Sequence, residues 1–277
     1  MVGAFFCHCS ATYSIDEIKT NMRFGIHLCY NGSAFAGWQR QVNAAGIQEN
    51  IENGLSVLLK SETTITGCGR TDTGVHAFNY FAHFDTDINP KDLNEFVYHL
   101  NAIIDSNIHV FEVFPVIDEW NARFSATKRS YRYYILTERN PFLSQFSWMV
   151  PYSLNIDNMN EAASLLIGKH DFTSFAKLHG NQKTGICTVA SAGIIQSGSL
   201  ITFEISADRF LRNMVRAISG TLIDIGRGRT EKDSILELMA SKNRSQAGAS
   251  VPAQGLFLSE VLYENNPEIP QNRKPFF

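Results

Sequence analysis

The chain has 277 residues, 44% of them hydrophobic and 18% charged, which is typical of a globular protein and excludes a fibrous or intrinsically disordered one. Its length suits one large domain or two moderate ones. A formal net charge of −3 argues against a surface that binds polyanions everywhere, although a local basic groove is compatible with it. Five cysteines, none in a C-x-x-C pair, predict a reduced cytoplasmic protein without a structural zinc site.

Residues 1–22 are predicted to form an N-terminal extension without ordered structure. The short apolar run near Met1 has no basic segment before it, and no stretch of the chain approaches the length of a membrane span. The first convincing strand begins just after Met22, so we expect translation to start at that methionine. An intact mass of the native protein would test this expectation.

Residues 23–118 are predicted to form the first half of the fold, because alternating and helical hydrophobic patterns follow one another there. The predicted order is β-α-β-β-α-β, which generally gives an antiparallel sheet with both helices on one face. The expected elements are a strand at 23–30, a helix at 47–59, strands at 63–67 and 77–84, a helix within 90–103 and a strand at 108–116.

The same order repeats over residues 119–265, and residues 266–277 are predicted to be a loosely held tail with several prolines. The fold class is therefore α+β, with two related β-α-β-β-α-β halves of the RRM or ferredoxin-like kind. Their antiparallel sheets are expected to meet edge to edge or face to face around a central cleft. The expected elements are strands at 130–137, 185–195, 200–206 and 256–263, and helices at 156–166, 209–223 and 231–240.

One connection between two predicted strands, residues 67–74, combines three glycines with Arg70 and Asp72. Glycine permits backbone conformations closed to other residues and allows a ligand to approach closely. A single D-x-G turn is more often structural, with the aspartate capping the backbone and the arginine in a surface ion pair. A dinucleotide site is excluded because a strand, not a helix, follows. A calcium loop at residues 85–96 is excluded because Pro90 replaces the required glycine.

Basic residues cluster at Arg123, Lys128, Arg129 and Arg132, where they alternate with aromatic residues such as Tyr131. Cations that neutralise phosphate, next to rings on which a base can stack, are typical of proteins that bind single-stranded RNA. The alternative is an ordinary sheet strand with core tyrosines, which accounts for one face of the strand but not for the charge cluster. The central cleft would then bind RNA.

A second basic stripe is predicted on the helix at 209–223, where Arg209, Arg212 and Arg216 share one face. A solvated arginine stripe is the alternative interpretation. His76 and His170 have no cysteine or histidine at metal-ligand spacing, so both are predicted to be structural.

Six segments together resemble, in order, the motifs of the TruA family of tRNA pseudouridine synthases, and the resemblance covers Arg23 to Tyr263. Asn31 departs from the pattern, since the family usually has aspartate there. The segments are YNGS (30–33) with GWQRQ (37–41), GRTDTGVHA (69–77), KRSYRY (128–133), GKHDFTSF (168–175), FLRNMVR (210–216) and PAQGL (252–256).

The resemblance implies a tRNA pseudouridine synthase acting at positions 38, 39 and 40 of the anticodon stem-loop, with Asp72 as the nucleophile. It implies that Arg216 pairs with Asp72, that Arg70 helps hold a flipped nucleotide out of the stem, and that Tyr131 stacks on the uracil. An arginine near a carboxylate favours its ionised, nucleophilic form. The residues predicted to contact the RNA backbone are Arg40, Lys128, Arg129, Arg132, Arg209 and Arg212.

No cofactor, metal or membrane is implied, and the partners expected are tRNA and a second copy of the chain in a homodimer. Two alternatives come from other classes. A non-enzymatic RNA-binding protein would need the aromatic RRM motif, which the strands lack. A metal-dependent hydrolase would need several clustered carboxylates, and none lies near Asp72 in the sequence.

Overall fold

The computed structural model describes residues 21–177, 184–264 and 269–275. The predicted extension, residues 1–22, lies outside the described residues except at its end, where the first strand begins at Met22. The architecture is mixed α+β, as the sequence predicts, and it is built on one ten-stranded sheet.

The first half follows the predicted order closely. Its helices form where the apolar residues recur at helical spacing, and Asp92 caps α2 by accepting hydrogen bonds from Asn94 N and Glu95 N. Its elements are β1 (Met22–Tyr30), α1 (Ile47–Leu59), β2 (Ile65–Gly67), β3 (His76–Thr86), α2 (Leu93–Ile103) and β4 (Ile108–Val116).

The second half contains the predicted elements and two short strands that the sequence patterns did not indicate, β6 (Trp148–Met149) and β7 (Gly168–Asp171). Strands of two and four residues are too short to show an alternating pattern. The other elements are β5 (Lys128–Leu136), α3 (Ile156–Ser164), β8 (Ile186–Ser197), β9 (Leu200–Ala207), α4 (Met214–Gly226), α5 (Ser234–Ser241) and β10 (Leu256–Leu262).

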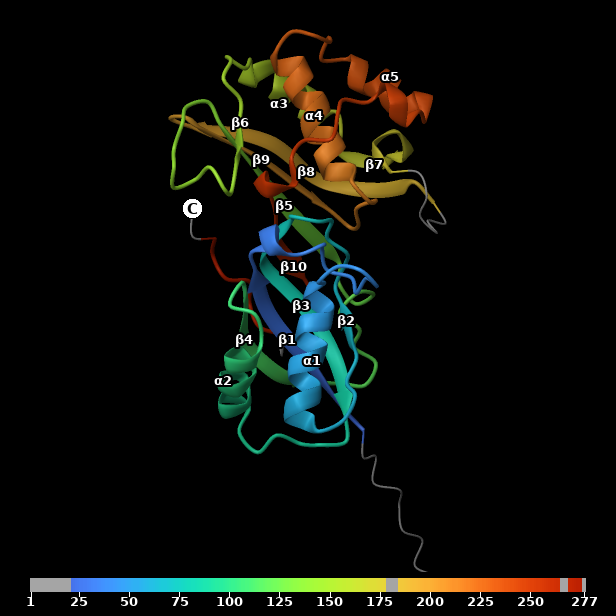
Figure 1. The fold of residues 1–277 in the computed structure, drawn as a ribbon. Helices are drawn as coiled ribbons and strands as arrows, with labels where there is room; N and C mark the ends of the chain where they lie inside the picture. The colour runs from blue at the N-terminus through green and yellow to red at the C-terminus, as the bar shows by residue number, and fades with distance from the viewer. Residues whose placement is uncertain (1–20, 178–183, 265–268, 276–277) are drawn as a thin grey trace, which may run out of the picture.

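A single sheet joins the halves, in the strand order β4-β1-β3-β10-β5-β9-β8-β7 (Figure 1). The last strand, β10, makes this join because it pairs antiparallel with β5 and, through Phe257 and Leu258, parallel with β3. Of the two arrangements left open by the sequence, the halves meet edge to edge. The expectation of purely antiparallel sheets is wrong at this point, since a strand from the end of the chain completes the sheet between β3 and β5.

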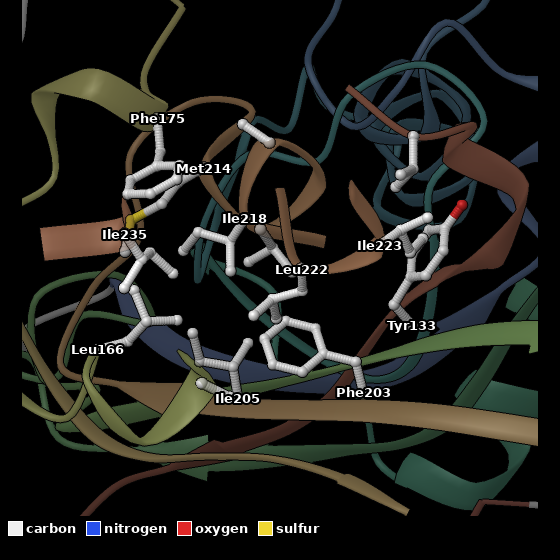
Figure 2. Close-up of a cluster of buried hydrophobic side chains, with 14 of the residues drawn as sticks. Tyr133, Leu166, Phe175, Phe203, Ile205, Met214, Ile218, Leu222, Ile223 and Ile235 are labelled. Carbon is white, nitrogen blue, oxygen red and sulfur yellow. The ribbon is translucent and has the colours of Figure 1, made fainter. Parts of the chain in front are cut away.

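Each half has its own hydrophobic core on the sheet. In the second half, Ile218 and Leu222 of α4 face Phe203 and Ile205 of β9 (Figure 2). In the first half, α1 and α2 cover β1, β3 and β4 (Figure 1). Tyr131 of β5 packs against both cores, so this residue stands at the junction of the two halves.

The predicted helix at 209–223 begins later than expected, at Met214. Asn213 has a left-handed backbone (φ 67°), which interrupts any helix that would run through it. Arg209 and Arg212 are therefore outside the helix, and the predicted arginine stripe on one helical face does not form.

The described part of the tail, residues 269–275, is bound to the sheet, which corrects the prediction of a loosely held segment. Asn79 of β3 pairs with the backbone of Arg273, accepting from its N (2.7 Å) and donating to its O (2.9 Å). Asn272 likewise pairs with the backbone of Val261 in β10. Side-chain amides hold this segment where proline excludes regular strand pairing.

Candidate active site

Asp72 lies in the loop between β2 and β3, and backbone hydrogen bonds fix both ends of that loop. Cys68 N donates to Phe81 O (2.8 Å) at the start, and Val75 N donates to Asp72 O (3.1 Å) at the end. The aspartate thus takes part in a turn through its backbone, which leaves its side chain available.

The segment after β1 packs directly on the loop. Trp38 N donates to Thr71 O (3.2 Å), and the hydroxyls of Tyr30 and Thr71 lie 2.9 Å apart. Gly37 has φ +98°, and a Cβ at this position would lie 2.5 Å from Thr71 O. The contact therefore requires glycine, both for its backbone conformation and for the close approach.

A second contact of the same segment holds the end of the loop. Gly32 N donates to Nδ1 of the buried His76 (3.1 Å). Asn31 Oδ1 accepts from Ser33 N (3.1 Å), so its side chain caps the short 3-10 turn that follows β1.

Two arginines bind the carboxylate of Asp72, which is 25% exposed. Arg216 Nη1 lies 3.8 Å from Oδ2, and Arg212 Nε lies 3.4 Å from Oδ1. The aspartate side chain thus faces two cations from the second half of the chain instead of capping its own turn. Sequence reasoning had assigned Arg212 to the RNA backbone and missed this contact, which no local pattern signals because Arg212 lies outside the helix.

Tyr131 of β5 lies close enough to Asp72 for the two to interact electrostatically. Its ring is half-buried, with the edge of the Phe210 ring packed against it at a centroid distance of 5.1 Å. Burial raises the pKa of the Tyr131 phenol well above its usual range, and the charge of Asp72 adds to this effect. Tyr131 is therefore an uncharged phenol at neutral pH.

The side chain of Arg129 donates hydrogen bonds to backbone carbonyl oxygens of the protein itself. Its guanidinium donates to Cys68 O (3.1 Å) in the loop of Asp72, and to carbonyl oxygens of Ala126 (2.7 Å) and Asp208 (3.0 Å). A further bond goes to Arg123 O. One side chain thus joins the loop of Asp72 to two other segments. The first is the segment before β5, with Arg123 and Ala126, and the second is the segment between β9 and α4, with Asp208.

Three other arginines and lysines predicted to contact RNA form ion pairs within the chain. The partners of Lys128 and Arg132 are acids distant in the sequence, so the local sequence showed these cations without their counter-charges, whereas the partners of Arg40 lie in the following helix, α1. The pairs are Lys128 with Glu260 (3.4 Å), Arg132 with Glu204 (2.7 Å), and Arg40 with Glu49 (3.2 Å) and Glu52 (3.8 Å).

Arg70 and Arg209 differ from these residues. Within the described residues neither side chain makes a hydrogen bond or an ion pair, and Arg70 is exposed beside Asp72 in the loop. His170 Nε2 lies 3.0 Å from Ile167 O, a local structural contact. The roles predicted for Arg70, Tyr131 and the basic residues in substrate binding stay predictions.

No group of three or more His, Cys, Asp or Glu residues that could hold a metal ion occurs among the described residues. In the same part of the chain, no helix is long and apolar enough to cross a membrane.

Residues 162–264 match the family model described as tRNA pseudouridine synthase. The matched segment contains Arg212 and Arg216 but not Asp72, and it points to an enzyme of the pseudouridine synthase class.

Curated relatives narrow the class. The proteins named tRNA pseudouridine synthase A from Parabacteroides distasonis and Bacteroides fragilis are 45% and 43% identical, each over 87% of this chain and 96% of the relative. The protein of the same name from Thermoanaerobacter sp. is 39% identical over 84% of this chain and 96% of the relative. The chain belongs to the tRNA pseudouridine synthase A family, so the family and the enzyme class predicted from the sequence are confirmed.

Proposed function

We propose that this enzyme isomerises uridine to pseudouridine at positions 38, 39 and 40 of the tRNA anticodon stem-loop, with Asp72 as its nucleophile. The relatives' name, tRNA pseudouridine synthase A, supports tRNA as the substrate. One observation supports the assignment of Asp72 as the nucleophile: its carboxylate is partly exposed and is held by Arg212 and Arg216 on a loop with a fixed backbone.

The reaction replaces the N1–C1′ bond of uridine by a C5–C1′ bond and releases the hydrogen of C5 as a proton. Asp72 forms a transient covalent bond to the nucleotide, at C1′ or on the uracil ring. Arg212 and Arg216 hold the carboxylate in position for such an attack. In this proposal Arg216 is the lasting partner of Asp72, and Arg70, exposed in the same loop, helps hold the flipped nucleotide out of the stem.

Tyr131 is proposed to stack on the uracil and to help move the proton from C5. Its raised pKa supports the first role, since a neutral phenol ring suits stacking on a base. The same shift constrains the second role: the phenol enters the reaction protonated, so it can accept the C5 proton only while passing on its own.

The surroundings of the site belong to the same proposal. We place the RNA in a central cleft and treat residues 23–118 and 119–265 as two related RRM or ferredoxin-like units. The strand orders of the two units support this relation. The order is β4-β1-β3-β2 in the first unit and β10-β5-β9-β8 in the second, and the two orders match strand by strand. A cytoplasmic homodimer that binds tRNA through Arg40, Lys128, Arg129, Arg132, Arg209 and Arg212 completes the proposal.

Tritium release from tRNA labelled with [5-³H]uridine tests the reaction, in buffer containing EDTA. Transcripts with a single uridine at position 38, 39 or 40 test the site of modification. The wild type is expected to release tritium from all three. Asp72→Asn should lose the activity by on the order of 10⁴-fold or more, as expected when a covalent nucleophile is removed.

Asp224→Asn is the matched control, because Asp224 is 30% exposed and pairs with Arg229 at 3.1 Å, a geometry close to that of Asp72. It should keep wild-type activity. Retained activity in Asp72→Asn would contradict the assignment of the nucleophile. Release only after magnesium is added would favour a metal-dependent reaction, and tRNA binding without release would favour a binding protein.

A further inference from the structure

Arg212 and Arg216 hold Asp72 in different ways. Arg216 lies in the first turn of α4, is 21% exposed, and its Nε also donates to Val251 O at 2.8 Å. Arg212 precedes the helix and is 58% exposed. Among the described residues, Asp72 is the only partner of its side chain. One arginine is thus anchored by the protein, and the other is anchored by Asp72 alone.

Each arginine faces a different oxygen of the carboxylate. Arg216 faces Oδ2 and Arg212 faces Oδ1, so neither oxygen is bare in the free enzyme. The 3.4 Å between Arg212 Nε and Oδ1 and the 3.8 Å between Arg216 Nη1 and Oδ2 are both long for hydrogen bonds between charged groups, which are usually about 2.7–2.9 Å. Exposure and anchoring therefore distinguish the two arginines, and the ion pair of the exposed Arg212 contributes little.

The backbone of Arg212 is well fixed although its side chain is not. Lys177 N donates to Arg212 O (3.1 Å), and the next residue, Asn213, has a left-handed backbone and donates from its side chain to Ser250 Oγ (2.7 Å). The side chain can therefore change partner by rotation about its own bonds, without moving the chain.

We infer that Arg212 is a displaceable partner of Asp72, which leaves Oδ1 for a phosphate group of the RNA when the substrate binds. The inference rests on the proposed function. A guanidinium binds phosphate with two parallel hydrogen bonds, a better geometry than its single long contact with Oδ1. The exchange bares Oδ1 at the moment of binding, while Arg216 keeps Oδ2, so that Oδ1 is the attacking oxygen.

The chemical step that follows balances without a further reactant. If Oδ1 attacks C1′, the C1′–N1 bond breaks and its electron pair leaves with the uracil. If Oδ1 attacks C6, the electron pair of the C5–C6 double bond shifts towards the C4 carbonyl, whose oxygen takes the negative charge. In both routes the attacking oxygen must first lose its arginine.

A double-mutant cycle on tRNA affinity tests the exchange. In the wild type Asp72 competes with RNA for Arg212, so Asp72→Asn should tighten tRNA binding. Once Arg212 has become glutamine, no competition is left and the same change should have a smaller effect. We expect the two effects on Kd to differ by about fivefold or more, as for side chains in direct contact.

The Arg212→Gln enzyme should also show the loss of one phosphate contact. The slope of log K against log salt should fall by about 0.7–0.9, and Arg212→Lys should restore most of it. The loss of single-turnover activity should be larger at subsaturating than at saturating enzyme, because the lost interaction is one of binding. Arg229→Gln is the matched control, since Arg229 is 56% exposed and pairs with Asp224; its salt slope should be unchanged.

Equal effects of Asp72→Asn in both backgrounds would overturn the inference, because they would reflect only the general charge of the site. A fall of the saturated rate by more than about a hundredfold in Arg212→Gln would overturn it too, since Arg212 would then hold Asp72 during the reaction. The cycle measures binding alone, so it stands apart from the tritium assay. An absence of tritium release by the wild type would instead contradict the proposed function.

Discussion

The loop that carries Asp72 and the first residues of β5, 128–132, both attract notice in the sequence because charged residues cluster there. In the structure the two regions use their charges differently. Asp72 meets arginines from across the molecule, and Arg70 is exposed beside it. On β5 the cations are neutralised or bound within the protein, by acids on neighbouring strands or by backbone carbonyls.

The difference comes from position in the sheet. β5 is a central strand between β10 and β9, so each of its side chains has cross-strand neighbours on two sides. Arg132 lies opposite Glu204 of β9 in the register, and the acid of β10, Glu260, reaches Lys128. The loop has no such neighbours and depends on the few backbone contacts that hold it. A cluster of charge in the sequence therefore does not by itself show which of its cations have counter-charges within the protein.

The largest effect is expected from breaking the support of the loop. Gly37→Ala puts a Cβ 2.5 Å from Thr71 O at a φ of +98°. Strain and overlap together should cost about 3 kcal/mol or more of unfolding free energy. They should also displace Asp72, so tritium release should fall in the protein that still folds. Chemical denaturation and the tritium assay measure the two effects.

Gly69→Ala is the control for that change. In the described chain, a Cβ at Gly69 meets no heavy atom within 4 Å, and its φ is outside the positive range. Its unfolding free energy should stay within about 1 kcal/mol of the wild type. If both variants were equally stable, the close approach of Gly37 to the loop would not matter to the fold.

Breaking the link between the two regions should have the next largest effect. Arg129→Gln leaves the part-buried carbonyls of Ala126 and Cys68, the latter in the loop, without their charged donor. We expect a loss of about 2–3 kcal/mol of unfolding free energy. Lys128→Gln removes only an exposed ion pair and should cost less than about 0.5 kcal/mol. Equal losses in denaturation would show that Arg129 acts as a surface charge, like its neighbour.

The dependence of stability on pH sharpens the comparison, because one histidine of β3 accepts a backbone hydrogen bond beside each region. His76 accepts from Gly32 N beside the loop, and His83 accepts from Ala122 N (3.2 Å) shortly before β5. Burial lowers the pKa of each to about 4, below the ordinary value of 6.5. Protons therefore bind the unfolded chain first, and stability present above pH 6.5 is lost as the pH falls towards 4.

Each histidine should account for a loss of about 2 kcal/mol between pH 7 and pH 5. Urea denaturation at the two pH values would measure it. His76→Gln and His83→Gln should each lose less stability between these values than the wild type, since glutamine still accepts a hydrogen bond but does not titrate. An unchanged loss in both variants would assign the acid sensitivity to other groups.

Most secondary structure could be read from local patterns. The helices α1 and α2 and the strands β1, β3 and β4 lie within a few residues of their predicted bounds. The start of α4 could not be read, because Asn213 leaves the helical conformation to bind Ser250, a residue far along the chain. The tail was misjudged for the same reason, since its bonds go to Asn79 and Val261.

By itself the sequence determined the α+β class, the enzyme family and the segment that carries Asp72, because hydrophobic periodicity and motifs are properties of neighbouring residues. Only the tertiary structure decided that β10 joins the halves into one sheet and that Arg212 shares Asp72 with Arg216. It also decided that Arg129 bonds to Cys68 O in the loop of Asp72. These outcomes depend on strand pairing and on contacts between distant residues, whose geometry no local pattern encodes.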